Sequence, residues 1–471
     1  MNIAMIASEI NPLAKSGGLA DVVYSLSKEL SKLGHEVICI LPFYQSIRAK
    51  GGKFAYRGSY GVSLSWRHAN CDVYSTQIDG ISYYLLDNRY YFGRSSLYGY
   101  MDDGERFAFF QTAARGLFGY IGFVPDVIHC HDWQTGMIPC LVREQNGFDP
   151  TFSKAKFVFT IHNPAFKGII DRYFLRDFYE LPDELYFNGK VRFEGMVSTL
   201  KTGIVYSDYV TTVSPNHAKE LLTPEGGFGL DGVLRMKGEA FSGIVNGIDY
   251  DEWDPLRDPL IYKNFSYTNV TSGKRECRKR LFDVALFPDN GGPVFGLVSR
   301  LTYQKGIDLV LSLGREIAEA GGYLFVLGSG EYGLEQGLEA LRRDYPESVC
   351  IYIGYSNERA HLIYSGADFF LMPSLFEPCG IGQMVAMRYG TLPIVRRVGG
   401  LPDTVEDPSS SKEPTGFIFN DYDLGGLRYG VSRAYEVYED KGKLLKMRRN
   451  AMKADHSWKK AAAEYLDIYS R

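Results

Sequence analysis

Residues 15–22 read KSGGLADV and place one lysine and two adjacent glycines directly after a short apolar run. That order is typical of a buried strand, a glycine turn and a helix. Because Gly17 and Gly18 lack a Cβ, the backbone can approach a ligand closely, and the helix N-terminus offers unpaired N–H groups to an anion. Lys15 adds a positive charge. The segment predicts a phosphate- or carboxylate-binding loop, although a tight turn with a solvated lysine also fits these residues.

Two further cations follow the apolar run 294–298. Arg300 and Lys305, in the segment SRLTYQKG, lie in the loop at the carboxyl end of this expected strand, which is where open α/β sheets bind ligands. Two fixed cations suit a diphosphate, because each charge-assisted hydrogen bond contributes about 1.5–3 kcal/mol. Taken alone, the pair also fits two solvated loop side chains.

Glu377 is the acid best placed for chemistry on a sugar. It lies in SLFEPCGIGQ, between a strand-like run and a helix expected to begin near Gly382, and it shares the loop with Cys379 and Gly380. A carboxylate in such an apolar, proline-constrained loop can orient sugar hydroxyls or stabilise positive charge developing on a sugar carbon. The alternative interpretation is that Glu377 caps the helix N-terminus.

Three histidines and one aspartate form another group. His129 and His131 lie two apart in HCHDWQTG and therefore share one face of a strand, with Asp132 next to them. They imitate a metal site, but a structural metal normally takes four protein ligands and no further His or Cys group supports one, so no metal is expected. His162, in TIHNPAF, is the better functional candidate, with a satisfied core histidine as its alternative.

The segment 328–333 reads GSGEYG and matches the dinucleotide pattern GxGxxG after an apolar run. That role needs an acid at the end of the next strand to bind a ribose, whereas the next run here ends in Tyr355 and Ser356. The pattern also belongs to the first strand of a nucleotide-binding half, and this run is the second of its series. A nicotinamide or flavin role is therefore not favoured.

Composition restricts the class of partner. The chain of 471 residues carries 52 basic and 56 acidic side chains, a formal net charge of −4, without a long run of either sign. This argues against nucleic-acid partners and polybasic membrane contacts. Seven cysteines are scattered without a CxxC pattern, and no apolar run reaches the roughly 18 residues of a membrane span. We expect reduced core thiols, no signal peptide and a soluble, cytoplasmic protein.

Short apolar runs alternate with amphipathic stretches along the chain, which indicates α/β folding with parallel sheets covered on both faces. The length exceeds what one core supports, so two domains are expected. The expected strands are 3–7, 36–41, 73–78, 81–86, 127–130, 156–161 and 209–213, and then 294–298, 323–327, 349–353, 369–372 and 392–395.

The segment 246–255, NGIDYDEWDP, has no periodic pattern and is the expected hinge. The predicted organisation is a first domain over 1–245 and a second over 246–454. A terminal amphipathic helix follows within 455–471, and the N-terminal domain is one candidate for its packing partner.

The motifs together resemble a known family. They occur in the order and spacing found in bacterial glycogen synthases and plant starch synthases, glycosyltransferase family 5, and the resemblance covers essentially the whole chain: KSGGLADV, HCHDWQTG, TIHNPAF, TVSPNHAKE, NGIDYDEWDP, SRLTYQKG, SLFEPCG and GGLPDTV. Eight ordered motifs make chance similarity very improbable, unlike a single short pattern. The resemblance implies the GT-B fold: two facing Rossmann-like, doubly wound parallel-sheet domains with an interdomain cleft.

The resemblance also implies an activity. Such enzymes transfer glucose from ADP-glucose to the non-reducing 4-hydroxyl of an α-1,4-glucan with retention of configuration, and use no metal or other cofactor in the chemistry. ADP-glucose and glycogen are thus the implied partners. A UDP-glucose-using synthase, a catalytically silent nucleotide-sugar-binding paralogue and a phosphorylase of the same architecture stay open as alternatives.

The family's functional residues carry over to matching positions of this chain. Donor binding is implied for nine residues: Lys15, Gly17, Gly18, Asn246, Arg300, Lys305, Tyr355, Cys379 and Gly380. Roles in the chemistry are implied for five, of which two also bind the donor: Glu377, His162, Asp132, Arg300 and Lys305. Arg300 and Lys305 would neutralise the departing diphosphate, Glu377 would lie nearest the reacting glucose, and Tyr355 would pack on the adenine.

The chain departs from the family pattern at three positions. Ser16 stands where threonine is commoner, which keeps the hydroxyl. Val398 precedes Gly399 where threonine is frequent, and Pro402 replaces an alanine. Because valine has no side-chain donor, a hydroxyl contact to phosphate would be missing there while backbone N–H contacts persist. The departure bears on donor affinity and not on the reaction.

Overall fold

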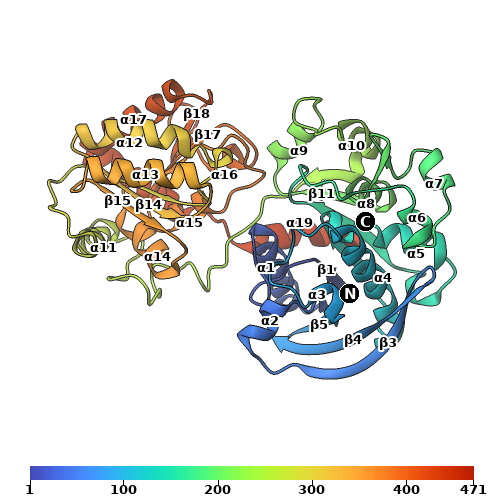
Figure 1. Cartoon of the computed structure of the whole chain (residues 1–471). Helices are drawn as coiled ribbons and strands as arrows, with labels where there is room; N and C mark the ends of the chain where they lie inside the picture. Colours follow the sequence, from blue (N-terminus) through green and yellow to red (C-terminus); the bar gives the residue numbers. More distant parts are fainter. The chain divides into compact units, whose positions relative to one another are not determined.

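The structure, a computed structural model, describes residues 1–471 and divides them into two compact units. Unit 1 comprises Met1–Gly247 together with Trp458–Arg471, and unit 2 comprises Ile248–Ser457. In Figure 1, unit 1 runs from blue to green and includes the red C-terminal helix, whereas unit 2 runs from yellow-green to orange-red. The two-domain α/β organisation with parallel sheets is therefore confirmed, and each unit is described by itself.

Unit 1 contains a nine-stranded sheet in the order β12-β11-β7-β6-β1-β2-β5-β4-β3. Its strands are β1 (Asn2–Ile6), β2 (Glu36–Pro42), β3 (Ala55–Leu64), β4 (Arg67–Ile78), β5 (Ile81–Asp87), β6 (Val127–His131), β7 (Lys156–Ile161), β11 (Tyr209–Thr212) and β12 (Phe241–Gly243). The central strands β1 and β6 are almost wholly buried, as their apolar sequences predict. A small second sheet joins β8 (Ile169–Ile170), β10 (Met196–Ser198) and β9 (Arg192–Phe193).

Most strand pairs in the sheet of unit 1 are parallel, as expected, and an antiparallel hairpin extends the sheet at one edge. Strand β5 pairs parallel to β2, but β4 pairs antiparallel to both β5 and β3. Asp79 and Gly80 connect β4 to β5 with φ angles of +50° and +79°, and Asp-Gly with two positive φ angles is a favoured hairpin turn. Strand β3 escaped the sequence analysis because its alternation of tyrosine, glycine and polar residues leaves most of it exposed.

The helices of unit 1 connect these strands. They are α1 (Gly18–Lys32), α2 (Gln45–Lys50), α3 (Arg89–Phe92), α4 (Asp103–Ile121), α5 (Ile138–Gln145), α6 (Phe174–Asp177), α7 (Glu184–Phe187), α8 (Thr199–Tyr206), α9 (Pro215–Leu221), α10 (Asp231–Lys237) and the C-terminal α19 (Trp458–Ser470). Figure 1 shows α19 beside α1 and β1. Its buried side chains, among them Trp458, Tyr465 and Tyr469, belong to the core of unit 1.

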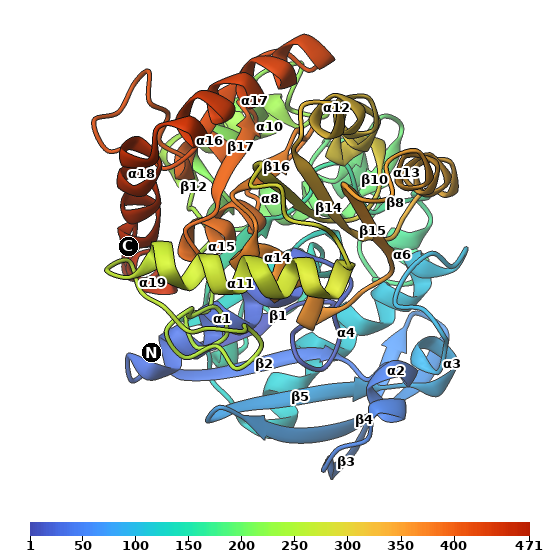
Figure 2. The same ribbon diagram turned by 90° about the vertical axis from the view of Figure 1, so that its left-hand side faces the viewer.

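Unit 2 is built on a six-stranded, wholly parallel sheet in the order β15-β14-β13-β16-β17-β18. Its strands are β13 (Val294–Val298), β14 (Tyr323–Gly328), β15 (Val349–Ile353), β16 (Phe369–Met372), β17 (Leu392–Arg396) and β18 (Phe417–Phe419). Its helices are α11 (Val270–Ala285), α12 (Ile307–Glu319), α13 (Tyr332–Asp344), α14 (Asn357–Gly366), α15 (Gly382–Arg388), α16 (Leu401–Thr404), α17 (Leu424–Glu439) and α18 (Lys441–Lys453). Figure 2 shows α12 and α13 on one side of this sheet and α11 and α14 on the other.

Side-chain caps mark several helix starts. Ser214 Oγ accepts a hydrogen bond from His217 N at the start of α9, and Ser356 Oγ accepts one from Arg359 N at the start of α14. Helix α1 differs, because Gly17 precedes it without any side-chain cap. No capping side chain therefore accepts a hydrogen bond from the first backbone N–H groups of α1.

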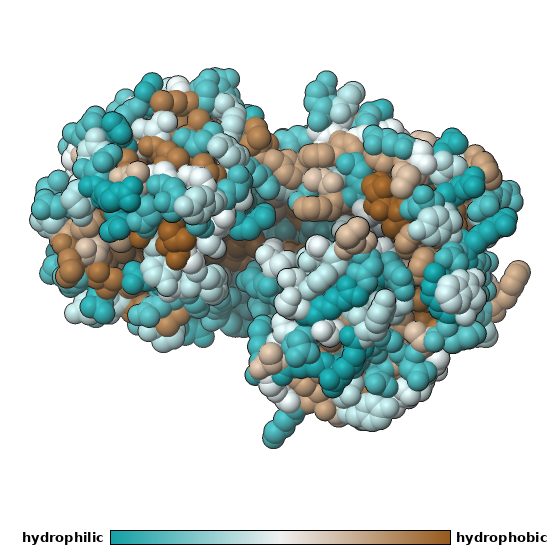
Figure 3. Space-filling model, viewed as in Figure 1, coloured by the Kyte–Doolittle hydropathy of each residue, from teal (hydrophilic) through white to brown (hydrophobic).

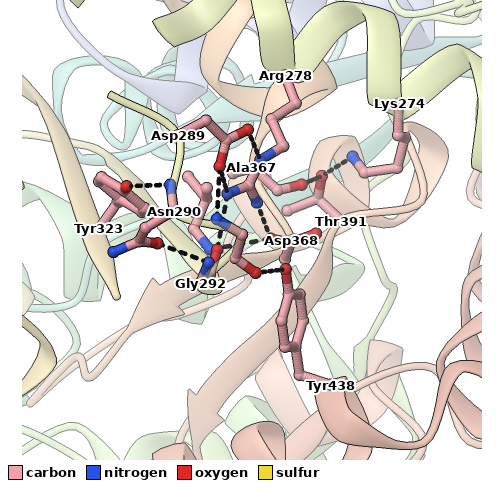
Figure 4. Close-up of polar contacts among 12 residues, drawn as sticks. Lys274, Arg278, Asp289, Asn290, Gly292, Tyr323, Ala367, Asp368, Thr391 and Tyr438 are labelled. Carbon is pink, nitrogen blue, oxygen red and sulfur yellow. Dashed lines mark hydrogen bonds and ion pairs between the residues drawn. The ribbon is translucent and has the colours of Figure 1, made fainter. Parts of the chain in front are cut away.

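A partly buried ionic cluster connects α11 and α18 to the sheet of unit 2, and Figure 4 shows its members Lys274, Arg278, Asp289 and Asp368. Arg278 of α11 donates to Asp368 at 3.1 Å and to Asp289 at 2.6 Å, and Arg448 of α18 also binds Asp368. Lys274 donates to Ser365 O at 2.9 Å and to Thr391 Oγ1 at 2.6 Å, near the carboxyl ends of α14 and α15. These ion pairs and hydrogen bonds offset the free-energy cost of removing the charged groups from water.

Helix α19 occupies most of the range 455–471, in which the sequence predicts a terminal helix. Helix α18 ends at Lys453, and α19 begins only at Trp458. Between them His456 O accepts a hydrogen bond from Ile248 N at 2.8 Å, in a parallel bridge between Ile248 and Ser457. The two segments that link the units are therefore hydrogen-bonded to each other.

The surface seen in Figure 3 is mainly hydrophilic, and its apolar residues occur singly or in small groups. None of the helices combines the length and the apolar character needed to cross a membrane.

Candidate active site

The lysine–glycine loop of unit 1 is held by a buried acid that precedes it. Glu9, 4% exposed, accepts hydrogen bonds from the backbone N–H and the hydroxyl of Ser16, the latter at 3.1 Å. Burial raises the pKa of the Glu9 carboxyl, and the hydrogen bonds from Ser16 and Gly17 partly oppose that rise. Glu9 therefore fixes the backbone that presents Lys15 and Gly17.

Lys15 itself is paired within unit 1. Its ammonium lies 2.8 Å from a carboxylate oxygen of Asp21 on α1, while 44% of the Lys15 side chain stays exposed. Burial raises the pKa of Asp21, against the lowering effect of Lys15. A Cβ added at Gly17 would meet no atom within 4 Å, so the glycine faces open space. The loop thus offers an oriented cation and uncrowded backbone to a ligand.

Asp132 follows β6 in a conformation that non-glycine residues rarely adopt. Its φ is +57°, and strain of this kind costs about 1–3 kcal/mol and is concentrated at functional sites. Its carboxylate accepts hydrogen bonds from His162 N at 2.7 Å and Asn163 N at 3.4 Å. Burial raises the pKa of Asp132 to about 7, although these N–H groups oppose the rise. Asp132 therefore orients the loop that follows β7.

The structure brings the three candidate histidines together. His131 Nδ1 and His162 Nε2 lie 3.0 Å apart, and the rings of His129 and His131 have centroids 4.1 Å apart. Burial lowers the pKa of His129 and of His162 to about 3. No group of three or more His, Cys, Asp or Glu side chains is arranged to hold a metal ion.

Asn246 is the last candidate site residue of unit 1. It is 5% exposed, and its Oδ1 is buried without a hydrogen-bond partner. Buried polar atoms normally have partners, so this amide is suited to a ligand that supplies one.

In unit 2, Lys305 and Glu377 form a direct ion pair. Lys305 Nζ lies 2.5 Å from Glu377 Oε2, which also accepts a hydrogen bond from Ser374 Oγ at 3.1 Å. The two side chains come from the loop after β13 and the loop after β16, whose strands are neighbours in the sheet. Glu377 is 6% exposed. The Glu377 carboxylate is thus held in one place by an ammonium and a hydroxyl, which suits a role near developing positive charge.

Two glycines allow this loop to pack closely. Gly380 has a φ of +77°, and its Cβ would contact the Gln383 side chain; a Cβ at Gly399 would overlap the carbonyl oxygen of Glu377. Gly400 N donates to that same oxygen at 3.2 Å. Cys379 directly precedes Gly380 and is 5% exposed. The backbone around Glu377 is therefore fixed by close contacts.

Arg300 and Tyr355 are the exposed members of the group. The Arg300 guanidinium makes no hydrogen bond or ion pair with the protein, and Tyr355 is 83% exposed. Both follow strands of the same sheet, β13 and β15, at the carboxyl edge. A charged fork and an aromatic ring at this edge are free to contact a ligand such as a nucleotide.

Comparison with known proteins shows the family to which the chain belongs. The model of the starch synthase catalytic domain matches residues 2–236, and that of glycosyl transferases group 1 matches residues 279–454. A glycogen synthase of Anoxybacillus flavithermus is 43% identical over 100% of this chain and 97% of its own length. One of Clostridium kluyveri is 40% identical over 100% and 99%. The chain belongs to the glycogen and starch synthase family of glycosyltransferases.

Solved structures agree with the family assignment. The catalytic domain of starch synthase IV from Arabidopsis thaliana, bound to ADP and acarbose, superposes with a TM-score of 0.93 at 32% identity, over 100% of this chain and 99% of that one. Sucrose-phosphate synthase from Thermosynechococcus elongatus reaches a TM-score of 0.64 at 19% identity, over 100% and 98%, and supports the GT-B fold alone. The resemblance seen in the sequence motifs is confirmed.

Three residues of the candidate site were not among the functional residues predicted from the sequence. Glu9 carries the loop of Lys15, His131 contacts His162, and Ser374 binds Glu377. Glu9 gave a usable signal, because it is the one acid inside the apolar stretch 3–10. His131 was considered only as an apparent metal ligand, and Ser374 gave no signal.

Proposed function

We propose that this chain is a retaining glucosyltransferase that moves glucose from ADP-glucose to the non-reducing 4-hydroxyl of an α-1,4-glucan and so elongates glycogen. The observation that carries the proposal is the full-length identity of 40–43% with curated glycogen synthases. The solved relative bound to ADP and acarbose, a nucleotide and an oligosaccharide analogue, supports the choice of donor and acceptor.

The charges in each unit suit the departure of a nucleoside diphosphate. Breaking the bond between glucose C1 and the diphosphate leaves a cation-like carbon and a leaving group that gains negative charge. Arg300 and Lys305, with Lys15 from unit 1, would stabilise the leaving group, and preorganised electrostatic contacts of this kind are usually the largest contribution to catalysis.

Glu377 and His162 would act at the sugar. The Glu377 carboxylate, held by Lys305 and Ser374, is proposed to stabilise positive charge at the reacting glucose. Asp132 is proposed to position the His162 loop, because its carboxylate binds the His162 backbone. Asn246, Cys379, Gly380, Tyr355 and the Gly17–Gly18 backbone are proposed to bind the donor.

Retention of configuration follows from attack on the face that the leaving group departs from. The acceptor hydroxyl oxygen bonds to C1, the bond from C1 to the diphosphate breaks, and the departing phosphate oxygen takes the hydroxyl proton. A double displacement through a protein carboxylate is the rival route. Trapping of a glucosyl-enzyme with a slow donor would favour that rival.

A coupled assay tests the proposal. Purified chain is given ADP-glucose or UDP-glucose with a glycogen primer, and the released nucleotide and the anomeric configuration of the new linkage are measured. We expect ADP release with α-1,4 elongation, at a rate clearly above that with UDP-glucose. A faster reaction with UDP-glucose would support that alternative donor, and no transfer from either donor would indicate a silent paralogue. The cytoplasmic location stays a prediction.

A further inference from the structure

His131 lies directly behind the candidate sugar-contacting histidine. It ends strand β6, it is fully buried, and its Nδ1 is 3.0 Å from Nε2 of His162, which follows the neighbouring strand β7. The Nε2 of His131 is buried without a hydrogen-bond partner. The Nδ1 of His162 has no protein partner, and this ring is only partly buried. The two rings therefore form a chain that leads from the core to an accessible nitrogen.

Both rings are neutral at neutral pH. Burial lowers the pKa of His131 well below its ordinary value and lowers that of His162 to about 3. A neutral imidazole carries one N–H and one bare nitrogen. A hydrogen bond between two neutral rings therefore has one donor and one acceptor, and the tautomer of one ring determines that of the other.

The hydrogen bond between His131 and His162 can have two arrangements, in which either ring is the donor. The surroundings of His131 decide between them. If His131 donates from Nδ1, its partnerless Nε2 is a bare nitrogen. If His131 accepts at Nδ1, its proton lies on Nε2, and a buried N–H group has no acceptor. Buried N–H groups without partners are rare and cost about 1–3 kcal/mol, whereas acceptors without partners are more common. The first arrangement is favoured.

The third histidine restricts the position of the His131 ring. His129 Nε2 lies 2.6 Å from Thr160 Oγ1, and its Nδ1 lies 2.7 Å from the hydroxyl of Tyr469 on α19. Its ring packs against His131 at a centroid distance of 4.1 Å. The C-terminal helix thus supports the wall against which His131 lies.

We propose that His131 is a positioning residue that holds His162 in the tautomer with its proton on Nδ1, so that His162 presents an N–H donor to a hydroxyl oxygen of the bound sugar. This inference rests on the proposed function for the identity of the ligand. His162 then acts by hydrogen bonding and not as a general base.

Nitrogen NMR of the full chain labelled with 15N-histidine tests the tautomer directly. The His162 signals are assigned by their loss in a His162→Gln variant. In the unmodified chain we expect Nδ1 of His162 to show the shift of a protonated nitrogen and Nε2 that of a bare nitrogen, and His131 to show the same pattern. A proton on Nε2 of His162, or equal populations of the two tautomers, would overturn the proposal. This measurement needs no folded variant of His131.

Variants then test the role of His131. His131→Leu removes the donor, so we expect His162 to lose its single tautomer and kcat/KM to fall about tenfold, the loss of roughly one hydrogen bond, while ADP affinity changes less than twofold. Tyr469→Phe is the control, because it leaves the His131–His162 pair intact and should leave the His162 tautomer unchanged. An unchanged tautomer in His131→Leu would contradict the positioning role. If the expected tautomer is found without glucosyl transfer, the proposed function and the sugar as ligand fail, whereas the control of the His162 tautomer by His131 stands.

Discussion

The acids of this protein are specialised by what surrounds each carboxylate. Glu377 is bound by an ammonium and a hydroxyl, whereas Glu9 is bound by a backbone N–H and a hydroxyl of the loop it supports. Asp132 binds two backbone N–H groups and carries a pKa of about 7. Of these three carboxylates, only that of Glu377 lies beside a cation suited to a diphosphate. We therefore expect substitutions of the three acids to have different effects.

Replacing Glu377 by glutamine separates chemistry from binding. Glu377→Gln keeps the size and most hydrogen bonding of the side chain but removes its charge, so kcat should fall by ~10², equivalent to about 2.7 kcal/mol of transition-state stabilisation. ADP affinity should barely change, as measured by calorimetry. Ser374→Ala is the control, since it removes one hydrogen bond and keeps the charge, and its effect on kcat should be much smaller. Tenfold weaker ADP binding with near-normal kcat would show that Glu377 is a structural cap.

Replacing Glu9 by glutamine tests the support of the lysine loop. Glu9→Gln cannot accept both hydrogen bonds from Ser16 with equal strength, because one carboxylate oxygen becomes a donor amide. We expect KM for the donor to rise about tenfold, with a smaller fall in kcat, from steady-state kinetics. Glu29→Gln, the same change on the far part of α1, should leave KM unaltered. A normal donor KM in Glu9→Gln would remove Glu9 from the site.

At the scale of elements, the carboxyl ends of parallel strands collect the candidate residues. The loops after β13, β15 and β16 carry Arg300, Lys305, Tyr355 and Glu377, and those after β6 and β7 carry Asp132 and His162. Elsewhere, charged pairs join the elements themselves. Asp407 binds Arg433 of α17 at 2.6 Å and accepts from Ile418 N of β18 at 2.7 Å. This carboxylate links α17 and the edge strand to the segment after α16.

The Asp407 pair predicts a pH-dependent contribution to the stability of unit 2. Burial alone would raise the pKa of Asp407, but the donors Arg433, Ser409 and Ile418 outweigh it and lower the pKa to about 2. A carboxyl whose pKa is lower in the folded than in the unfolded state stabilises the folded state at pH values above the unfolded-state pKa. For Asp407 this contribution is about 2 kcal/mol. The contribution should be complete above about pH 5 and should be lost as the pH falls through 3.8 toward 2.

The measurement is the denaturation midpoint of Asp407→Asn against the unmodified chain at several pH values. The variant should be less stable at pH 7, and the difference should narrow below pH 4. Glu316→Gln, which breaks the exposed pair with Arg428, should cost under about 1 kcal/mol. A difference independent of pH would show that packing, and not the charge, makes Asp407 stabilising.

At the scale of the whole molecule, we expect cationic side chains to neutralise the diphosphate, as a metal ion does in other nucleotide-sugar enzymes. Lys15, Arg300 and Lys305 are the candidates for neutralising a diphosphate, and they are distributed over both units. The chain should therefore need both units for activity but no divalent ion.

Activity should survive EDTA, because fixed cationic side chains stabilise the leaving group without a Lewis acid. Initial rates with ADP-glucose and glycogen primer are compared before and after chelation and gel filtration, and they should agree within twofold. Loss of turnover that Mg²⁺ or Mn²⁺ restores would contradict this prediction.

The sequence predicted the strands that are wholly apolar and the motifs that lie in their loops. Strands 156–161, 294–298, 349–353 and 369–372 have the bounds expected, because a buried parallel strand must be apolar on both faces. Strand β3 was missed, because an exposed edge strand alternates polar and apolar residues and carries little signal. The sequence analysis also missed the short strands β8, β9, β10, β12 and β18, because so few residues carry no recognisable pattern.

What the sequence by itself determined is the set of chemical groups: a lysine beside two glycines, an arginine and lysine pair, and an acid in a constrained loop. Only the tertiary structure decided their partners. Lys305 meets Glu377 across 72 positions of sequence, and His129 meets Tyr469 across 340. Strand order and helix packing set such contacts, and local residue patterns do not encode them. For that reason the motifs predicted the family, whereas the support of Lys15 by Glu9 and of His162 by His131 came from the folded chain.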